Sequence, residues 1–462
     1  MHEESRDISG SGKFVREEND QAIRTLFEGV HPAQVADELS LLNEQDIWYA
    51  MRVLGVDNAT RVFQYFDEDL QVRLASGEHR RMMAKMLEEM DHDDRADLVS
   101  ELDEDVKDRL LPLVAHAERE DIRRLASYGE GTTGAIMSSD YASVRPGMTV
   151  EQTIQTLRLE APDRETIYYV YVIDGVRHLV GFVELKDLIR ARPNQKVEDV
   201  MKRDVIHVTV GTDQEETARM IGKYDVIALP VVDAHHELVG IVTYDDAIDV
   251  IKQEQTEDFE KFMAIGGEHE AGTYLKTNAF RHFHKRVYWI VGLAAVELVS
   301  GLVIHSYEDA LTTLVLLALY MPMITDTGGN TGSQSATVVI RALALGEIRP
   351  NFVGLVKVFR KEIIVAGLMA IVLMFLSFGK VLFLSYKAVL PGEFTLSGIG
   401  SVIALALGIQ VLSATMIGAL LPMIAARCKL DPAVVASPAL TTLVDITGLL
   451  IYFGTARMLL GV

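Results

Sequence analysis

Four acidic residues interrupt the apolar segments that fill the C-terminal part of this chain: Glu297, Asp326, Glu362 and Asp445. An ionisable side chain at membrane depth costs about 2.5–3.5 kcal/mol to insert, so each is a functional candidate by default. Asp445 is the strongest, because apolar or small residues flank it on both sides and no Lys or Arg lies near it in the sequence. Glu362 follows Arg360 and Lys361, so we expect it at a helix start near the membrane surface.

The stretch TGGNTGSQ at residues 327–334 follows Asp326 and is rich in glycine and oxygen-bearing side chains. Together with Pro322, the paired glycines are expected to loosen the helix here and leave carbonyls free to face water. Oxygen ligands and a lone carboxylate suit a hard cation such as Mg²⁺, which keeps most of its water shell. A soft metal would need Cys or several His, and the apolar segments and their loops offer only Cys428 and His305.

Five apolar segments must position these acids, and they cover residues 288–304, 311–324, 362–384, 396–426 and 433–460. A helix of about 20 apolar residues spans the hydrocarbon, and no segment alternates with the period of two that a barrel requires. We therefore predict five transmembrane helices in the cell membrane and, since the first begins near residue 287, no N-terminal signal peptide. Lys and Arg gather in alternate loops, although the last two loops tie, which predicts a cytosolic N-terminus and an external C-terminus.

Charge divides the chain at the same place. Residues 287–462 hold 10 Lys+Arg and 9 Asp+Glu, whereas residues 1–286 hold 34 and 57, a net charge of −23. This acidity argues against a nucleic-acid partner and suits divalent cations. The single cysteine excludes a disulfide framework. No P-loop, HExxH or nucleophile-elbow motif is present, so the protein is not predicted to be an enzyme.

A homodimer is inferred from the lone acid of the last span. Five helices with one central carboxylate make a poor closed pore. A two-fold axis would bring two copies of Asp445 together, where the like charges repel unless a divalent ion lies between them.

Two internal repeats organise the acidic part. FDEDLQVRL at residues 66–74 matches LDEDVKDRL at 102–110, with a weaker copy at 42–50, and apolar residues recur every three or four positions. This pattern predicts short helices over residues 20–126, stacked as a small superhelix, with an ordinary helical bundle as the alternative.

The second repeat aligns residues 169–189 with 228–248 at a constant offset of 59. Each copy reads as strand, turn, strand and helix, preceded by a helix start at 148–151 or 211–214. The pattern resembles a tandem pair of CBS modules, whose Thr and Asp commonly hold a nucleotide ribose. Because Glu184 replaces that Thr in the first copy and would repel phosphates, at most one nucleotide site per chain is expected, and empty sites are equally open. The possible ATP contacts are Lys186, Asp187, Thr243 and Asp246.

An acidic helix starting near residue 250, with a sparse apolar stripe, is predicted to stop at the glycines 266–267. It is either a solvated connector or a movable rod that a cation can pin. The expected domains are an acidic helical domain (1–130), CBS modules (131–200 and 201–252), a connecting helix (253–280) and the five-helix membrane domain (281–462).

This domain order, with TGGNTGSQSA at 327–336 and LVDITGLLIY at 443–452, resembles the MgtE family of magnesium channels and transporters over essentially the whole chain. The resemblance implies Mg²⁺ uptake through a pore enclosed by a homodimer, with Asp445 binding hydrated Mg²⁺ and Asn330 and the backbone near Thr441 facing the ion path. It also implies that cytosolic Mg²⁺ holds the pore shut and that ATP tunes this sensor. The implied sensor residues are Asp93, Asp97, Glu215, Asp225, Asp246, Asp249, Glu254, Glu257 and Asp258.

Two positions depart from the family pattern: Ser437 stands where Asn is expected, and Glu297 adds an acid to the first span. The alternative function is the same scaffold carrying Co²⁺ or Mn²⁺, or coupling the cation to Na⁺, because selection of a hydrated ion depends on pore width.

Overall fold

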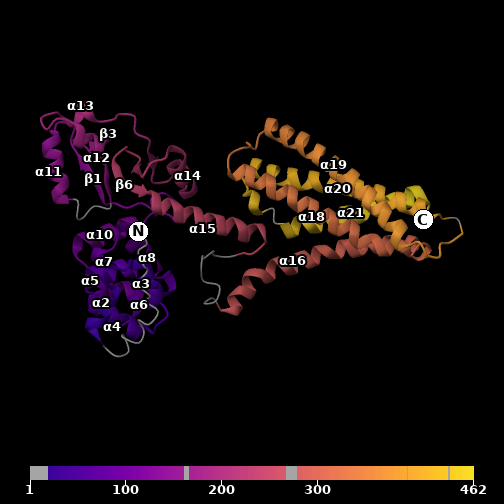
Figure 1. Ribbon diagram of the computed structural model, residues 1–462, viewed down its shortest axis with the longest axis horizontal. Coiled ribbons are helices and arrows are strands. Elements are labelled where there is room, and N and C mark those ends of the chain that lie inside the picture. Colours follow the sequence, from indigo (N-terminus) through magenta and orange to yellow (C-terminus); the bar gives the residue numbers. More distant parts are fainter. Residues whose placement is uncertain (1–18, 161–165, 267–277, 393, 435–436) are drawn as a thin grey trace. The chain divides into compact units, whose positions relative to one another are not determined.

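The computed structural model describes residues 19–160, 166–266, 278–392, 394–434 and 437–462. The chain divides into two compact units, Met1–Lys252 and Gln253–Val462 (Figure 1). The first holds a helical domain and two small sheets, and the second holds the long apolar helices.

The helical domain is a stack of short helices in which most contact the helix two places further along, as α3 contacts α5 and α5 contacts α7. This arrangement favours the predicted superhelix over a bundle. Asp67 of the first repeat caps α6 by accepting from the Leu70 N–H, and Asp103 occupies the same place before α9. The helices are α2 (Asp20–Phe27), α3 (Pro32–Leu39), α4 (Glu44–Leu54), α5 (Val56–Phe63), α6 (Glu68–Ser76), α7 (Arg80–Glu89), α8 (His92–Glu101), α9 (Glu104–Leu110) and α10 (His116–Leu125).

A buried ion network ties this domain together and to the first sheet module. Arg95 is 1% exposed and pairs with Glu118 at 2.5 Å and Asp121 at 2.9 Å. Asp121 also accepts a hydrogen bond from Ser139 and contacts His92 at 3.0 Å. Although burial opposes the charge, these partners hold the pKa of Asp121 well below its ordinary value.

The two sheet modules repeat with the predicted offset. Each has three strands, the first two parallel and the last two antiparallel. Tyr169 pairs with Glu184 and Ala228 with Thr243, so the register itself repeats. The elements are β1 (Tyr141–Val144), α11 (Val150–Glu160), β2 (Thr166–Ile173), β3 (Leu179–Glu184), α12 (Leu185–Arg190), α13 (Val197–Val200), β4 (Val208–Thr209), α14 (Gln214–Tyr224), β5 (Ala228–Val232) and β6 (Leu238–Thr243).

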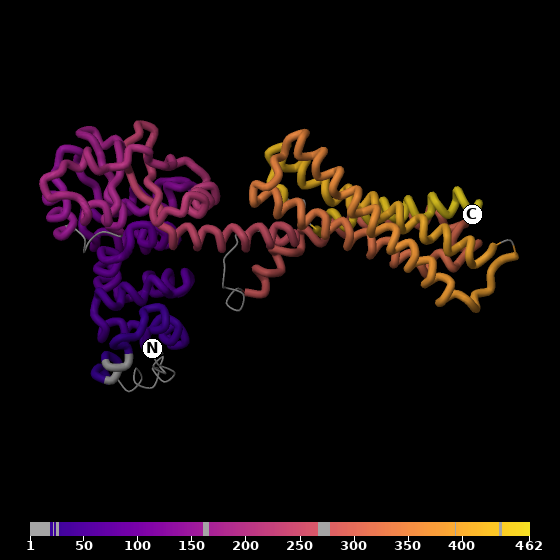
Figure 2. The backbone as a smooth tube through the Cα atoms, turned by 45° about the horizontal axis from the view of Figure 1, so that its top comes forward, coloured from indigo at the N-terminus to yellow at the C-terminus, as the bar shows by residue number. Residues whose placement is uncertain are grey.

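Helix α15 (Tyr244–Phe262) leaves the second module directly after β6 and continues without a break (Figure 2). The sequence predicted a helix starting near residue 250, but the last module helix and the connecting helix are one element. It ends before Ala264, whose φ is +58°. The remainder of the predicted connecting segment, residues 267–277, lies outside the described residues.

The apolar unit consists of α16 (Ala279–Ser306), α17 (Glu308–Thr313), α18 (Leu316–Ala344), α19 (Phe352–Leu384), α20 (Leu396–Arg427) and α21 (Ser437–Leu460). In the described chain, α16, α19, α20 and α21 are long and apolar enough to cross a membrane. Helix α18 has 29 residues, but Gly, Ser, Thr and Asn dilute its apolar character. The count of five spans therefore stays a prediction.

Two local expectations were wrong. Helix α18 passes through Pro322 and the paired glycines without interruption, so the helix is not loosened there. Glu362 does not lie at a helix start, because α19 begins ten residues earlier at Phe352, where Asn351 caps it by accepting from the Gly354 N–H at 2.8 Å. Its side chain is 8% exposed and accepts from the Ser335 hydroxyl at 2.8 Å.

Candidate cation sites

Close packing of three helices sets the geometry around Asp445. Gly332 of α18 and Gly418 of α20 meet backbone to backbone, since a Cβ on Gly418 would lie 2.1 Å from the Gly332 carbonyl oxygen. Gly328 and Gly448 leave a slot for Gln410, and a Cβ at either would come within 2.6 Å of its amide nitrogen. The glycines that the sequence associated with a loosened helix therefore bring the helices into contact.

Gln410 is fully buried and connects this packing to the helix that carries Asp445. Its amide nitrogen donates to the Val444 carbonyl at 2.9 Å. The residue directly before Asp445 is thereby fixed against α20. A buried amide without a partner would be costly, so this hydrogen bond favours one rotation of α21 over others.

Asp445 is only half buried, but its Oδ1 atom is buried and has no hydrogen-bond partner among the described residues. Glu297 of α16 and Asp326 of α18 lie within electrostatic range of this carboxylate. Two of the other predicted membrane acids therefore act electrostatically on Asp445. The three acids are not close enough to form a ready-made metal cage, as no such group of three is found among the described residues.

Asn330 and Thr441 lie near one another on α18 and α21. Asn330 is exposed one turn after Asp326, and Gln334 follows one turn later, so the three polar side chains share a face. The Thr441 methyl carbon packs on Gly329, where an added Cβ would be 2.9 Å away. The hydroxyl oxygens of Ser437 and Ser333 lie 3.0 Å apart. Serine, which stands at position 437 where the family pattern has Asn, therefore still makes a polar contact between these helices.

A second group of carboxylates joins α8 to the beginning of α15. Burial, together with repulsion from Asp94, Glu68, Asp246 and Glu101, raises the pKa of Asp97 to about 7. The pKa of Asp94 rises to about 6 for the same reasons, although its hydrogen bond from Gln64 at 2.7 Å opposes the rise. Burial and neighbouring acids raise the pKa of Asp246 too. Crowded anions of this kind attract a divalent cation.

The other implied sensor residues are spread more widely. Asp93 is buried on α8. Glu215 pairs with Arg219 at 2.5 Å, Asp249 pairs with Lys252 at 2.7 Å, and Asp225 ends α14 with a φ of +53°. Within the described parts of the chain, no contact brings Glu215 or Asp225 to the α8–α15 group. Glu254, Glu257 and Asp258 lie on the second half of α15.

Sequence reasoning missed several acids. Asp91, Asp94 and Asp245 belong to the α8–α15 group, and a run of acids at 91–97 together with one at 245–246 was the available signal. Asp431, in the loop before α21, accepts from Lys261 at 3.2 Å, and Lys261 also pairs with Glu257. These contacts raise the pKa of Lys261 against the effect of burial and attach α15 to that loop.

The possible nucleotide residues form two separate groups. The Thr243 hydroxyl and N–H both donate to Asp246 at the β6–α15 junction. In the first module Glu184 pairs with Lys186 and Lys202, whose hydrogen bonds hold its pKa below the ordinary value, and Lys202 lies 3.9 Å from Asp187. The negative charge of Glu184, which was expected to repel a phosphate, is therefore offset by two lysines.

Apolar helices carrying neighbouring acids, joined to a helical domain and a CBS pair, define a membrane transport protein with a regulatory part. Family models agree: the MgtE divalent cation transporter model matches residues 321–455, the MgtE intracellular N domain matches 30–131, and the CBS domain matches 134–194 and 197–253. The chain belongs to the MgtE family. This confirms the predicted fold class of helical domain, tandem CBS pair and apolar C-terminal helices.

Curated relatives match over almost the whole chain. The magnesium transporter MgtE of Thermus thermophilus is 36% identical over 449 residues, covering 96% of this chain and 97% of that protein. The magnesium transporter MgtE of Bacillus subtilis is 33% identical over 445 residues, covering 96% and 95%. Both are named as transporters, in agreement with the prediction that this protein is not an enzyme.

Among solved structures, the cytosolic domain of the Mg²⁺ channel MgtE in complex with ATP is 36% identical, with a TM-score of 0.50. The match covers 52% of this chain and 98% of that structure's chain. The soluble part of a magnesium transporter is 34% identical with the same TM-score, covering 52% and 95%. The N-terminal unit thus has the fold of a known cytosolic domain.

Proposed function

We propose that this protein takes up Mg²⁺ across the cytoplasmic membrane as a homodimer, with Asp445 holding the hydrated ion in the pore. The observation that carries the proposal is the Asp445 carboxylate, whose Oδ1 lacks a hydrogen-bond partner among the described residues and which lies within electrostatic range of the acids Glu297 and Asp326. Carboxylates within electrostatic range of one another in a low-dielectric region repel, and a cation offsets this repulsion. Asn330 and Thr441 contribute oxygens on the adjoining helices, and Mg²⁺ that keeps its water shell can be bound through such groups.

We further propose that Mg²⁺ in the cytosol closes the pore by binding the N-terminal unit. In the absence of a cation, the acids of α8 repel Asp246 at the start of α15. A cation that binds only the compact arrangement stabilises it by RT ln(1 + [L]/Kd) for each site. Further acids on α15, including Glu254, Glu257 and Asp258, offer additional positions where a cation can bind and stabilise the compact arrangement. Negative feedback on uptake follows.

The remaining parts of the proposal are the orientation and the nucleotide. The first 286 residues are assigned to the cytosol and the C-terminus to the outside, on the distribution of Lys and Arg. ATP is assigned to the CBS pair, with Lys186, Asp187, Thr243 and Asp246 as contacts. The relative whose cytosolic domain was solved with ATP supports this assignment.

Uptake into proteoliposomes containing an Mg²⁺-sensitive dye tests the pore. Asp445→Asn keeps the shape of the side chain and removes its charge, so uptake should fall to the background of empty liposomes. The matched control is Asp309→Asn, an exposed acid on α17, which should transport like the wild type. Wild-type uptake by Asp445→Asn, with unchanged thermal unfolding, would remove Asp445 from the ion path.

The same liposomes test the gating and the alternative ions. At high Mg²⁺ on the cytosolic side the wild type should close, whereas the double variant Asp97→Asn, Asp246→Asn should continue to transport. Replacing Mg²⁺ with Co²⁺ or Mn²⁺, or imposing a Na⁺ gradient, decides between the proposal and its alternative. Equal rates for these ions, or a rate that follows the Na⁺ gradient, would favour the alternative.

A further inference from the structure

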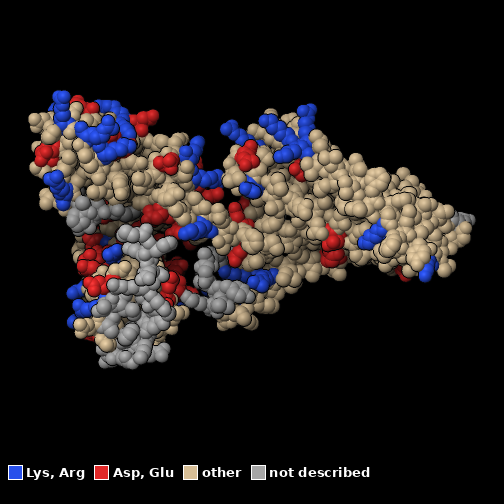
Figure 3. All heavy atoms as spheres, viewed as in Figure 1, with Lys and Arg blue, Asp and Glu red and all other residues tan. Residues whose placement is uncertain are grey.

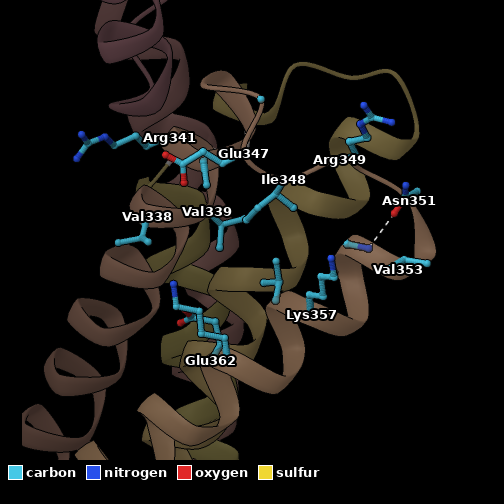
Figure 4. Close-up of a pocket in the computed structure, with 15 residues that line it drawn as sticks. Val338, Val339, Arg341, Glu347, Ile348, Arg349, Asn351, Val353, Lys357 and Glu362 are labelled. Atoms are coloured by element: carbon cyan, nitrogen blue, oxygen red, sulfur yellow. Dashed lines mark hydrogen bonds between the residues drawn. The ribbon is translucent and has the colours of Figure 1, made fainter.

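A cavity of about 680 Å³ opens where α18 ends and α19 begins (Figure 4). The end of α18, the turn 345–351 and the first turns of α19 form its walls. Two acids line it, Glu347 and Glu362, and the remaining charged residues of the lining are cations: Arg341, Arg349, Lys357 and Lys361. With four cations against two acids, the lining favours an anion.

The turn that carries Arg349 has a defined structure. Gly346 has a φ of +67°, which reverses the chain after α18. Gly354 lies so close to the turn that a Cβ there would be 2.1 Å from the Arg349 carbonyl oxygen. Together with the Asn351 cap, this contact fixes the turn against the first turn of α19.

The cations of the pocket have no acidic partner among the residues that the structure describes. In the described part of the protein, none of the four makes an ion pair, and Glu362 is engaged by Ser335 instead. Lys357 and Lys361 stand four residues apart on one helix face, where like charges repel. Figure 4 shows Arg341 and Arg349 at opposite ends of the pocket with Lys357 between them. Figure 3 shows Lys and Arg gathered at the end of the apolar unit where α19 begins.

The apolar part of α19 indicates where the pocket lies relative to the membrane. The 22 residues from 363 to 384 form a helix of about 33 Å, which spans the hydrocarbon. Lys357 and Lys361 therefore stand within two turns of its edge, at the level of lipid headgroups. One turn further into the apolar part of the helix, Ile364 is 64% exposed, which offers a surface for an acyl chain.

We propose that this pocket binds the headgroup of an anionic phospholipid. Its phosphate contacts the cations, while its glycerol and the beginning of its acyl chains cover the apolar wall formed by Val338, Val339 and Val353. A free phosphate would satisfy the cations but leave this wall uncovered. Basic pockets between transmembrane helices at the membrane surface are suited to acidic headgroups.

The test is native mass spectrometry of the full-length protein in detergent, titrated with phosphatidylglycerol. One variant replaces all four cations: Arg341→Gln, Arg349→Gln, Lys357→Gln and Lys361→Gln. A charge-conserving variant exchanges Arg for Lys and Lys for Arg at the same positions, and the control Arg427→Gln, Lys429→Gln removes two exposed cations outside the pocket.

We expect the glutamine variant to lose one retained phosphatidylglycerol per chain and its affinity to fall by at least about tenfold. The charge-conserving variant and the control should retain it. Equal retention by the glutamine variant would overturn the site, and so would loss of the lipid from the charge-conserving variant when its lipid-free unfolding temperature matches the wild type. Displacement of the lipid by millimolar inorganic phosphate would assign the pocket to free phosphate. Equal retention of phosphatidylcholine would overturn the requirement for an anionic headgroup.

Discussion

Lowering the pH from 8 to 6 should weaken Mg²⁺ binding by the N-terminal unit, because protons compete for the same carboxylates. Asp97 has a pKa of about 7 and Asp94 a pKa of about 6, both above the ordinary 3.8. At pH 8 Asp97 is about 90% ionised, and at pH 6 it is about 90% protonated, which reduces the apparent affinity about tenfold. Asp94 adds a factor of about two over the same range, so the combined loss is about twentyfold.

The same fall in pH that weakens Mg²⁺ binding should increase the folding stability of the protein without Mg²⁺. Both pKa values are raised in the folded protein, so the folded state binds more protons than the unfolded chain between pH 4 and 7. Stability of the cation-free protein should therefore increase as the pH falls from 8 to 6. The residues that repel Asp97 and Asp94 are Glu68, Asp91, Glu101, Asp245 and Asp246.

Thermal unfolding of the full-length protein, followed during Mg²⁺ titrations at pH 6 and pH 8 at one ionic strength, measures both effects. The variant Asp97→Asn carries no titrating group at this position, so its Mg²⁺ affinity should fall only about twofold between pH 8 and pH 6, the part that Asp94 contributes. The control Asp105→Asn removes an exposed acid that pairs with Arg109 on α9 and should behave like the wild type. Identical Mg²⁺ affinities at the two pH values, or an unchanged pH dependence in Asp97→Asn, would refute the reasoning.

The packing makes two further predictions that unfolding measurements can check. Gly448→Ala would place a methyl group 2.6 Å from the Gln410 amide and should destabilise the protein by about 1–3 kcal/mol, whereas Gly454→Ala, in open space on the same helix, should not destabilise it. Replacement of the buried Arg95 by Met should cost about 3 kcal/mol, because Glu118 loses its cation while Asp121 keeps only Arg124 and His92. The same change at the exposed Arg109 should cost about 1 kcal/mol or less, and similar losses at both positions would contradict the role given to burial.

Periodicity and repetition revealed those parts of the fold whose contacts are local. The offset of 59 between the modules was visible because equivalent residues occupy equivalent strand positions, and the pairing of Tyr169 with Glu184 and Ala228 with Thr243 repeats it in register. Hydropathy, in contrast, reports the length of helix that faces lipid. It placed the start of one helix at Glu362, although the Asn351 cap begins α19 three turns earlier.

Long-range contacts could not be read from the sequence in the same way. Gly328 and Gly332 were interpreted as a weakness of the helix, yet they provide the close approach of α18 to its neighbours. Asp97 and Asp246 were named through the family resemblance, because no spacing in the chain connects α8 with α15. Asp94, which also belongs to this group, was missed although the run of acids at 91–97 was visible in the sequence.

The continuity of α15 has a mechanical consequence. Its 19 residues form a rod of about 28 Å with no hinge between β6 and Phe262. A tilt of about 10° at its root would sweep its tip by about 5 Å, which is one turn of a neighbouring helix. In the gating proposed above, such a lever would convert a small rearrangement of the carboxylates at its root into a larger displacement at its tip, and a glycine pair inserted midway would uncouple the two ends.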